Sequence, residues 1–597
     1  MKVRLSDYVM QFLAERGVRT VFTVCGGGSI FLNDALGRSK IGYVACHHEQ
    51  GAAFAAEGYA RAAEALGVCL VTSGPGGTNA VTGCAAAWVD HVPVLFISGQ
   101  VFQRQTIAGH PGLRTMGVQE INIVDIARPI TKYAVMVQDP MTIRQHLETA
   151  VHVARSGRPG PVWLDIPADV QNAQIEVAML RGVGVGTTIE KAQDYRGLLE
   201  QIEEIITLLK TAKRPVVHIG QGVRIAKALP ELMRFLDLVR VPVLTARNGA
   251  DLIAEDHPLY IGRPGTFAQR GANFAVQTAD VYLAIGTRLS LAQTGYNARD
   301  YARNAKIIMV DVDRAELEKD TVRLHMKVEA SAAAFLVLFI SQVRDVLLPD
   351  WSLWLARCKA WQATYPAVAD AQRAQSRYLN SYALIDLLSD ALTPEDIVVT
   401  DMGFAFQNTY QAFRVKLGQR LMTNCGLAPM GWGMPAAIGA AAATGRRVIC
   451  IVGDGGLMMN VQELATLHAN KLPVKLFVLN NEGYLTMRQS QAHAFSGYMG
   501  SDEATGLTFP HFGTLAYAHH ISFWRLLDYS DARVRLREVL EGARPAFCEV
   551  MMSPEQAQIP KSLNRRNADG TLNQTLLEDA HPFLPKEEVE ANLKEPL

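Results

Sequence analysis

The sequence has no net charge, no paired-cysteine pattern and no apolar run of membrane length. Its 58 basic and 58 acidic side chains cancel, so charge gives no bias toward nucleic acid or a membrane surface. The eight cysteines are scattered without CxxC spacing, which favours reduced core residues over disulfides or zinc ligands. No apolar stretch is long enough for a bilayer, and the amphipathic, partly acidic residues 1–18 are unlike a signal peptide. We therefore expect a cytoplasmic protein with no nucleic-acid or membrane partner.

What the chain has instead is a repeated alternation of short apolar strands with helices. At 597 residues it is too long for one core, and about three to four domains are expected. Strands followed by glycine-rich turns and helices predict an α/β fold of three doubly wound parallel-sheet domains. The expected divisions are an N-terminal domain, a central domain, a third domain and a polar tail, at residues 1–175, 190–345, 375–552 and 553–597.

Residues 446–484 read as a strand, a glycine-rich turn, a helix and a second strand. Asp454 and Asn481 then lie beyond the carboxyl ends of neighbouring parallel strands, where open α/β sheets bind ligands. A carboxylate, an amide oxygen and uncovered N–H groups suit a Mg²⁺ ion bound to a diphosphate. The alternative is an ordinary turn with a capping aspartate. The paired Asn480-Asn481 that follows favours the cofactor site.

This GDG turn followed by NN resembles the thiamine diphosphate (ThDP) binding motif. Motifs in register along nearly the whole chain resemble acetolactate synthases, which are ThDP-dependent enzymes. The resemblance implies a pyrimidine-binding first domain, a central flavin-binding-like domain and a diphosphate-binding third domain. It also implies a Mg²⁺ site made by Asp454, Asn481 and Gly483. The ThDP contacts that it implies are Gly26, Pro75, Asn79, Gly403, Met430, Gly453, Gly455 and Gly456.

Two residues are candidates for catalysis. Glu49 follows a predicted strand in the run HHEQGAAFAAEGYAR and opens an Ala-rich helix; taken alone, it is a first-turn acid that favours the helix dipole. The resemblance implies that it hydrogen-bonds N1′ of the aminopyrimidine and so prepares the cofactor for loss of its C2 proton. Gln119 matches a family glutamine near the cofactor, although Val118 replaces a phenylalanine. A surface loop amide is the alternative for Gln119, and a core methionine is the alternative for Met430.

The central domain resembles the FAD-binding domain of acetolactate synthases. The positions that match FAD-binding residues of that family are Arg158, Gly222, Gly286, Arg288 and Asp311. Two runs depart from the family, because Ala246-Arg247-Asn248-Gly249 replaces its TLMG turn and Arg288-Leu289-Ser290 replaces its RFDDR run. Bound FAD would be structural, since the implied reaction has no net redox step.

The acceptor site differs from the family pattern at one position. Ser490 stands where acetolactate synthases carry a tryptophan, so we expect a roomier and more polar pocket, bordered by Tyr484 and Met487. Such a pocket suits a cyclic ketone or a keto-sugar. Alternatively, Tyr484, Met487 or the C-terminal tail refills the gap. The tail either wraps the surface or caps the active site, as its apolar Pro582-Phe583-Leu584 cluster suggests.

The resemblance implies a carboligase that decarboxylates a 2-oxoacid, pyruvate, and joins the remainder to a second carbonyl compound. It implies a homodimer as the smallest active unit, paired as a tetramer, with Glu49 from one subunit and Asp454 from the other. The alternatives are a simple 2-oxoacid decarboxylase or aldehyde lyase, a Rossmann-type NAD or FAD oxidoreductase, and a catalytically inactive partner subunit. Intact Glu49 argues against the last of these.

Overall fold

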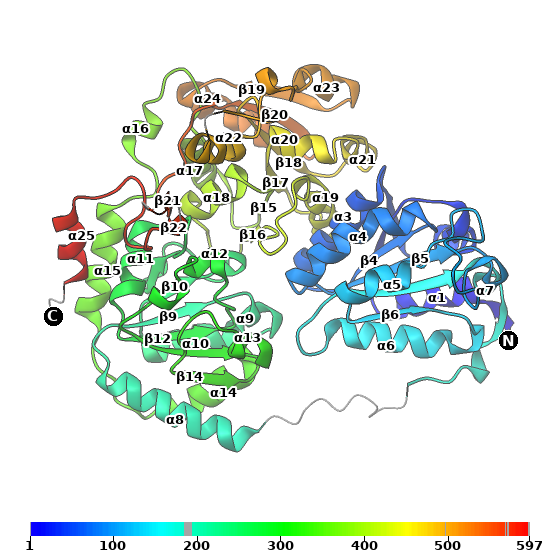
Figure 1. Ribbon diagram of the computed structural model, residues 1–597, viewed down its shortest axis with the longest axis horizontal. Helices are drawn as coiled ribbons and strands as arrows, with labels where there is room; N and C mark the ends of the chain where they lie inside the picture. The colour runs from blue at the N-terminus through cyan, green and yellow to red at the C-terminus, as the bar shows by residue number, and fades with distance from the viewer. Residues whose placement is uncertain (1, 184–193, 496, 567–568, 570–571, 595–597) are drawn as a thin grey trace.

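Three six-stranded parallel sheets organise the chain, and each is flanked by helices (Figure 1). The computed structural model describes residues 2–183, 194–495, 497–566, 569 and 572–594. The predicted fold class is confirmed. The expected start of the central domain at residue 190 and the last three residues of the tail lie outside the described residues.

The first domain holds a sheet whose strands lie in the order β3-β2-β4-β5-β7-β6. In that order the strands are β3 (Gly42–Ala45), β2 (Thr20–Thr23), β4 (Gly67–Val71), β5 (Val94–Gln100), β7 (Val162–Pro167) and β6 (Tyr133–Met136). Its helices are α1 (Leu5–Glu15), α2 (Ile30–Arg38), α3 (Glu49–Ala63), α4 (Pro75–Val89), α5 (Ile123–Ala127), α6 (Ile143–Arg155) and α7 (Ala168–Gln171). A short antiparallel pair, β1 (Lys2–Arg4) with β8 (Gln174–Glu176), joins the two ends of this domain.

The third domain repeats the same strand order when its strands are counted from its own first, as β16-β15-β17-β18-β20-β19. These are β16 (Arg420–Met422), β15 (Ile397–Thr400), β17 (Val448–Gly453), β18 (Val474–Asn480), β20 (Ala546–Met551) and β19 (Ser522–Leu526). Its helices are α17 (Ser381–Ala391), α18 (Phe404–Ala412), α19 (Gly433–Thr444), α20 (Asp454–Met459), α21 (Glu463–Ala469), α22 (Leu485–Ala494), α23 (Phe512–Ala518) and α24 (Tyr529–Leu540). Where the sequence predicts one helix after the GDG turn, the chain forms α20 and α21, because Asn460 leaves the helical conformation with a ψ of 35°.

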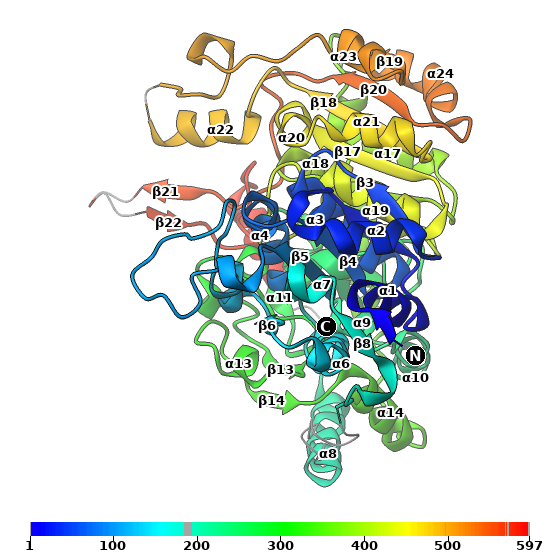
Figure 2. The same ribbon diagram turned by 90° about the vertical axis from the view of Figure 1, so that its right-hand side faces the viewer.

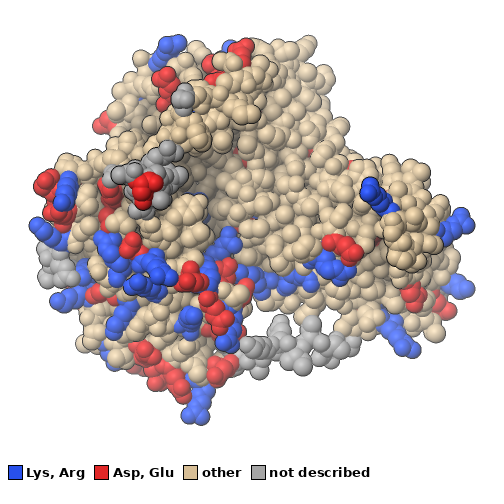
Figure 3. Space-filling view, viewed as in Figure 1, with Lys and Arg blue, Asp and Glu red and all other residues tan. Residues whose placement is uncertain are grey.

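The central domain has a different strand order, β11-β10-β9-β12-β13-β14. These strands are β11 (Tyr260–Gly262), β10 (Val243–Thr245), β9 (Pro215–Ile219), β12 (Val281–Ile285), β13 (Lys306–Asp311) and β14 (Met326–Glu329). Its helices are α8 (Tyr195–Thr211), α9 (Gly222–Ile225), α10 (Leu229–Val239), α11 (Arg270–Thr278), α12 (Leu291–Thr294), α13 (Arg314–Glu318) and α14 (Ala332–Val343). Counted from its own first strand, the order is 3-2-1-4-5-6, which is that of dinucleotide-binding folds. Charged side chains on the face shown in Figure 3 gather over this domain.

Helices α3 and α19 pack against each other and join the first and third domains (Figure 2). Both helices are rich in alanine and glycine, so their backbones approach closely. A Cβ placed on Gly439 would lie 1.9 Å from the Ala55 carbonyl oxygen, and one on Gly58 would lie 2.2 Å from the Ala436 carbonyl oxygen. Only glycine fits at these two positions.

An ionic junction connects all three domains at the other end of α3. Glu64 of the first domain accepts from Arg224 of the central domain at 3.1 Å and from Arg420 of the third at 3.3 Å. Asp251 of the central domain pairs with the same two arginines, at 3.1 and 2.8 Å. Asp251 is buried, whereas Glu64 is exposed, so the junction runs from the surface into the interior and ties the three domains together through both acids.

The C-terminal segment packs on the central domain. It contains the hairpin β21 (Asn564–Arg566) and β22 (Leu572–Gln574) and ends in α25 (Lys586–Leu593), which lies beside α15 (Ser352–Thr364) of the interdomain connector (Figure 1). Arg270 donates to the Pro582 carbonyl at 2.8 Å, and Leu584 packs against the central core. The apolar cluster that suggested an active-site cap is therefore bound to the central domain, and the cap stays a prediction.

Most of the cysteines lie in the core, as the sequence predicts. All eight cysteines are free thiols, and six of them are buried. Cys25 is exposed at the end of β2, contrary to the expectation of core positions. Across the part of the chain that the structure describes, no helix is both long and apolar enough to cross a membrane.

Candidate cofactor sites

Asp454 lies where two turns of the third domain meet. Gly453 of β17 pairs with Leu479 of β18, so Asp454 and Asn481 follow the ends of adjacent strands, as the sequence predicts. The Asp454 Oδ2 accepts from the N–H of Asn481 at 3.0 Å and of Gly483 at 3.1 Å, and its Oδ1 accepts from the N–H of Gly455 at 2.7 Å. A carboxylate offers about four lone-pair sites, so these three bonds leave one for a cation.

Burial raises the pKa of Asp454 to about 6, against the opposing effect of the N–H groups of Gly483, Gly455 and Asn481. A bound cation would favour the ionised carboxylate. Within the described ranges, no group of three or more His, Cys, Asp or Glu residues could hold a metal ion. A Mg²⁺ ion here would therefore bind Asp454, the Asn481 amide oxygen and a backbone carbonyl, with phosphate oxygens and water as its other ligands.

Glycines line this turn. The Cβ position of Gly453 has nothing within 4 Å, whereas Gly455 and Gly456 are packed closely against side chains of the same domain. A Cβ on Gly455 would lie 2.2 Å from the Tyr484 ring, and one on Gly456 would lie 2.5 Å from Asp401 Oδ2. Gly483 has a φ of 148° and Gly403 a φ of 69°, which L side chains rarely adopt. The cradle fits a diphosphate that approaches the backbone closely.

Met430 and Asp401 border the same turn. Met430 is 38% exposed, which excludes a core methionine, and its Cε lies 3.2 Å from the Cβ position of Gly455. Asp401 was not predicted. It is buried, it accepts the N–H of Gly431 at 2.9 Å, and burial raises its pKa to about 6. Its place directly after β15, next to the switch point of the sheet, is the signal that could have identified it.

Glu49 is the first residue of α3 and is buried. Its Oε2 accepts from Asn79 Nδ2 at 2.9 Å, and its Oε1 lies 3.7 Å from the Cβ position of Gly76. The turn that ends in Pro75, at the start of α4, therefore lies beside the carboxyl group. Sequence reasoning named both Glu49 and Asn79, but it did not predict the bond between them.

Gly26 and Gln119 flank this turn. A Cβ on Gly26 would lie 2.5 Å from Thr72, and one on Gly74 would lie 2.5 Å from the Gln119 carbonyl oxygen. The Gln119 residue is exposed and has a left-handed φ of 63°. Its backbone thus reaches the predicted site, while a catalytic role for its side chain stays a prediction.

The first and third domains meet beside Glu49. Asn460 Nδ2 donates to Gln50 Oε1 and to the Gly431 carbonyl, each at 3.0 Å. The N-terminus of α3 thus lies against the third domain of the same chain. The expected division of Glu49 and Asp454 between two subunits stays a prediction.

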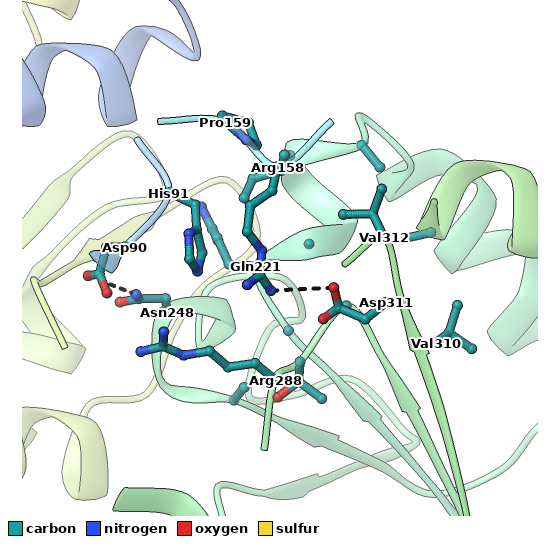
Figure 4. Close-up of a pocket in the computed structure, with 18 of the residues that line it drawn as sticks. Asp90, His91, Arg158, Pro159, Gln221, Asn248, Arg288, Val310, Asp311 and Val312 are labelled. Atoms are coloured by element: carbon teal, nitrogen blue, oxygen red, sulfur yellow. Dashed lines mark hydrogen bonds and ion pairs between the residues drawn. The ribbon is translucent and has the colours of Figure 1, made fainter. Parts of the chain in front are cut away.

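A pocket opens at the switch point of the central sheet, between β9 and β12, with an empty volume of about 1210 Å³ that includes its mouth (Figure 4). Two glycine turns form its floor, and the Gly222 N–H donates to the Gly286 carbonyl at 2.9 Å. All five residues predicted to bind FAD line this pocket: Arg158, Gly222, Gly286, Arg288 and Asp311.

The pocket suits an anionic ligand with polar edges. Four arginines line it, and Arg158 is paired with Asp311 at 3.3 Å (Figure 4). Gln221 Oε1, Arg247 Nε and His91 Nε2 are buried and have no hydrogen-bond partner among the described residues. Burial lowers the pKa of His91 to about 3, so its ring is neutral. Such orphaned polar atoms fit a site that is completed by a ligand.

The residues predicted for the acceptor pocket lie on and before α22. Ser490 is exposed and donates to the Thr486 carbonyl of its own helix at 2.9 Å, and Met487 is 48% exposed. The C-terminal segment contacts the neighbouring Gln489, whose Nε2 donates to the Gln556 carbonyl at 2.7 Å and whose Oε1 accepts from Lys561 Nζ at 3.1 Å. Tyr484 lies instead against Gly455 of the turn that follows β17.

Three protein-family models match successive parts of the chain. They are the thiamine pyrophosphate enzyme N-terminal TPP binding domain over residues 3–125, the central domain over residues 202–338, and the C-terminal TPP binding domain over residues 401–550. Thiamine pyrophosphate is ThDP, and the two matched TPP binding domains contain Glu49 and Asp454.

Curated relatives match over most of their length. The acetolactate synthase isozyme 1 large subunit of Escherichia coli (strain K12) is 32% identical over 558 residues, 93% of this chain and 95% of that protein. The isozyme 2 large subunit of the same organism is 34% identical, covering 91% of this chain and 95% of that protein. Acetolactate synthase 1, chloroplastic, of Zea mays is 33% identical, covering 93% and 86%. The chain therefore belongs to the thiamine pyrophosphate enzyme family, as a member similar to acetolactate synthase large subunits.

Proposed function

We propose that the chain is a ThDP- and Mg²⁺-dependent carboligase. It decarboxylates a 2-oxoacid, pyruvate, and transfers the remaining acyl unit to a second carbonyl compound. Two observations carry the proposal: the glycine-rich turn around Asp454 in the third domain, and the buried carboxyl of Glu49 in the first domain. Bound ThDP would supply an electron sink for the decarboxylated donor.

The chain's own residues would hold the cofactor and its metal ion and would exchange a proton with the cofactor. Asp454, Asn481 and the backbone at Gly483 would hold the metal and the diphosphate, and Met430, whose Cε lies 3.2 Å from the Cβ position of Gly455, would support the cofactor. Glu49 would exchange a proton with N1′ of the aminopyrimidine, and Asn79, which donates to Oε2 at 2.9 Å, would orient its carboxyl. The exposed Gln119, whose carbonyl oxygen lies 2.5 Å from the Cβ position of Gly74, would contact the donor.

The direct test measures CO₂ release from pyruvate by purified protein, with and without ThDP and Mg²⁺. Release that requires both cofactors is expected. If the protein binds ThDP yet releases no CO₂ from any 2-oxoacid, an inactive partner subunit becomes the better description. Release of free aldehyde with every acceptor present would instead favour a simple decarboxylase.

FAD is proposed for the central pocket. The five matched residues, the orphaned polar atoms and the 3-2-1-4-5-6 strand order support a dinucleotide. Arg247 belongs to the turn of residues 246–249 that differs from the family pattern. Its Nη2 already donates to the Ala292 carbonyl at 2.7 Å, so this group is not free for a ligand. The purified protein is expected to be yellow, with about one FAD per chain. An absorbance spectrum without flavin bands, taken on protein never stripped of ligand, would contradict this.

A bulky ketone or keto-sugar is proposed as the acceptor. Ser490 and Met487 are exposed on α22, so a tryptophan at position 490 would occupy space that the serine leaves free. Pyruvate should be consumed faster with a cyclic ketone or keto-sugar present than alone. Ser490→Trp should shift the ratio toward pyruvate self-condensation by about tenfold or more.

Ala492→Trp is the matched control for this prediction, because Ala492 is also exposed on α22 and lies two residues further along. It should leave the acceptor ratio unchanged. If the wild type condenses pyruvate with itself efficiently and accepts no larger ketone, the acceptor proposal is wrong and acetolactate synthesis is the better description.

A further inference from the structure

Arg488 of α22 holds the turn that carries the predicted metal ligands Asn481 and Gly483. Its Nη2 donates to the Asn481 carbonyl at 2.6 Å, and its Nη1 donates to the Glu482 carbonyl at 3.0 Å. A Cβ placed on Gly483 would lie 2.8 Å from the same Nη1. One planar guanidinium thus lies against all three residues of the turn, which the single ammonium group of a lysine could not do.

The turn has a backbone conformation that requires such support. Glu482 has a left-handed φ of 59° although it is not a glycine, and Gly483 follows with a φ of 148°. Residues in sparsely populated regions keep their conformation only where the surrounding contacts fix it. The Glu482 side chain is exposed, so the turn is held through its backbone, to which Arg488 donates.

Arg488 also orients the Asn481 side chain. Its Nη2 donates to Asn481 Oδ1 at 3.3 Å, and Asn481 Nδ2 donates to the Leu479 carbonyl at 3.4 Å. These two bonds distinguish the oxygen of the amide from its nitrogen. An amide oxygen has two lone pairs, so one remains for a cation, whereas the amide nitrogen is a donor and cannot bind one.

The charge of Arg488 is buried, because the residue is only 8% exposed. Among the described residues, all hydrogen-bond partners of its guanidinium are uncharged, and its buried Nε has no partner. A buried cation is costly unless an anion compensates it. Burial raises the pKa of Asp454, and the charge of Arg488 is among the effects that oppose this rise. The cation therefore acts on the predicted metal ligand, and a bound diphosphate would compensate it further.

The guanidinium is itself fixed by the C-terminal segment. Its Nη2 also donates to the carbonyl of Pro554 at 3.2 Å, just after β20. The next residue of α22, Gln489, binds the same segment through Gln556 and Lys561. A shift of α22 against this segment would break these bonds, so they keep Arg488 in place behind the turn.

We propose that Arg488 is a positioning residue of the metal site, which holds residues 481–483 in the conformation that offers the Asn481 amide oxygen to the ion. The inference rests on the proposed function, because it assigns the guanidinium this task only if Mg²⁺ binds at Asp454. All of these groups belong to the third domain of one chain and the segment that follows it, so the inference does not depend on which subunit supplies Glu49. The competing explanation is that Arg488 only stabilises the fold.

The experiment measures Mn²⁺ binding by electron paramagnetic resonance at saturating ThDP, with Mn²⁺ as the probe for Mg²⁺. Arg488→Met keeps an apolar stem but removes the charge and every donor. Its dissociation constant for Mn²⁺ should rise by about 10- to 100-fold, which is the usual cost of losing a group that orients a metal ligand. Arg488→Lys keeps the charge but cannot bridge two carbonyls, so its constant should lie between those of the wild type and Arg488→Met.

Arg447→Met is the matched control. Arg447 precedes β17, at the opposite end of the strand that leads to Asp454, and it donates to the Leu540 carbonyl at 3.1 Å and to Asp396 at 2.6 Å. This variant should lower the unfolding temperature, while its Mn²⁺ affinity should stay within about threefold of the wild type because the two sites are independent. If it weakens Mn²⁺ binding as much as Arg488→Met does, the effect is one of stability and the positioning role is refuted.

An unchanged Mn²⁺ affinity in Arg488→Met would also refute the positioning role, and tighter binding would show that the cation only repels the ion. If Arg488→Met does not fold, Arg488→Lys decides, because a wild-type affinity in that variant would overturn the need for a bridging guanidinium. Failure of the proposed function is distinguishable from these outcomes. In that case the wild type would bind no Mn²⁺ together with ThDP, or Asp454→Ala would bind Mn²⁺ as tightly as the wild type.

Discussion

The first and third domains have the same strand order, but their acidic site residues follow different strands of the sheet. In the first domain the acid follows the second strand, β3, and a glycine turn after β4 lies beside it. In the third domain the acid follows the third strand, β17, and an amide follows β18. The carboxyl ends of one scaffold thus offer several positions, and the choice among them would separate the proposed ring-binding half from the proposed phosphate-binding half.

The two acids also differ in how they are held. Asp454 accepts from three backbone N–H groups, which fix the carboxylate in place, as a metal ligand requires. Glu49 has a side-chain partner, Asn79, which can adjust while a proton moves. Backbone anchoring would suit the proposed metal ligand, and a side-chain partner would suit the group proposed to exchange its proton.

The largest expected effect separates these two roles. Asp454→Ala should lose Mg²⁺ and with it ThDP, because the diphosphate would be left uncompensated in a buried turn. Glu49→Gln should keep ThDP but lose C2–H exchange, since an amide cannot share the N1′ proton. Gel filtration followed by cofactor assay, and NMR exchange, measure the two outcomes. Stoichiometric ThDP on Asp454→Ala would remove it from the metal site.

Mixing the two variants sharpens the comparison further. If the halves of a site come from different subunits, a heterodimer of Glu49→Gln and Asp454→Ala chains contains one intact site and regains activity. If both halves come from the same chain, every site carries one defect and the mixture stays inactive. Tagged chains, unfolded and refolded together, give the readout, and each variant treated alone is the control.

The next effect tests the contact between the domains. Gly439→Ala and Gly58→Ala would place a methyl group 1.9 and 2.2 Å from carbonyl oxygens across the α3–α19 contact, and overpacking of this kind costs about 1–3 kcal/mol or more. Gly37→Ala, in α2 with nothing within 4 Å of its Cβ position, is the control and should be neutral or stabilising. Urea unfolding checks this, and equal stability of all three variants would contradict the packing argument.

The smallest effect concerns the pH dependence of folding stability. The stability of the apo protein should fall as pH rises, whereas the stabilisation by bound cofactor should grow. Burial raises the pKa of Asp165 in the first domain to about 7 and that of Asp454 to about 6. Both groups hold their protons more tightly folded than unfolded, so the apo protein should lose stability as pH rises from about 4 to 7, by up to about 1.4 kcal/mol per unit for each group. Mg²⁺ needs ionised Asp454, so stabilisation by Mg²⁺-ThDP should grow as pH rises through about 6.

Thermal unfolding between pH 5 and 8, with and without Mg²⁺-ThDP, measures both slopes. Asp165→Asn should make the apo slope shallower, since Asp454 and Asp401 still contribute, and should leave the cofactor-dependent gain intact. A cofactor-dependent gain that shrinks as pH rises would contradict a role for ionised Asp454.

Local patterns predicted the parts of the site that depend on one strand and its turn. Asp454 and Asn481 could be placed because each follows a buried strand of a single βαβ unit. Asp401 has the same signal and was missed. The bond between Asn79 and Glu49 depends on how α4 lies against α3, and the Glu463 carboxylate of the third domain accepts from the His47 N–H of the first at 3.1 Å. Neither contact leaves a periodicity in the sequence, since both arise from how distant segments pack. The apolar Pro582-Phe583-Leu584 cluster marked a docking segment, but no pattern could identify which surface receives it.

The ionic junction of Glu64, Arg224, Asp251 and Arg420 bears on whether the three sheets can exist as separate proteins. An isolated first domain would lose both cation partners of Glu64 and would expose the glycine-rich face of α3 that α19 now covers. In an isolated central domain, buried Asp251 would keep its ion pair with Arg224 but lose the one with Arg420 of the third domain. Each sheet has its own apolar interior, yet its rim is completed by its neighbours. We therefore expect the chain to unfold as one cooperative unit rather than in three modular steps, and fragments cut at the connectors to be insoluble.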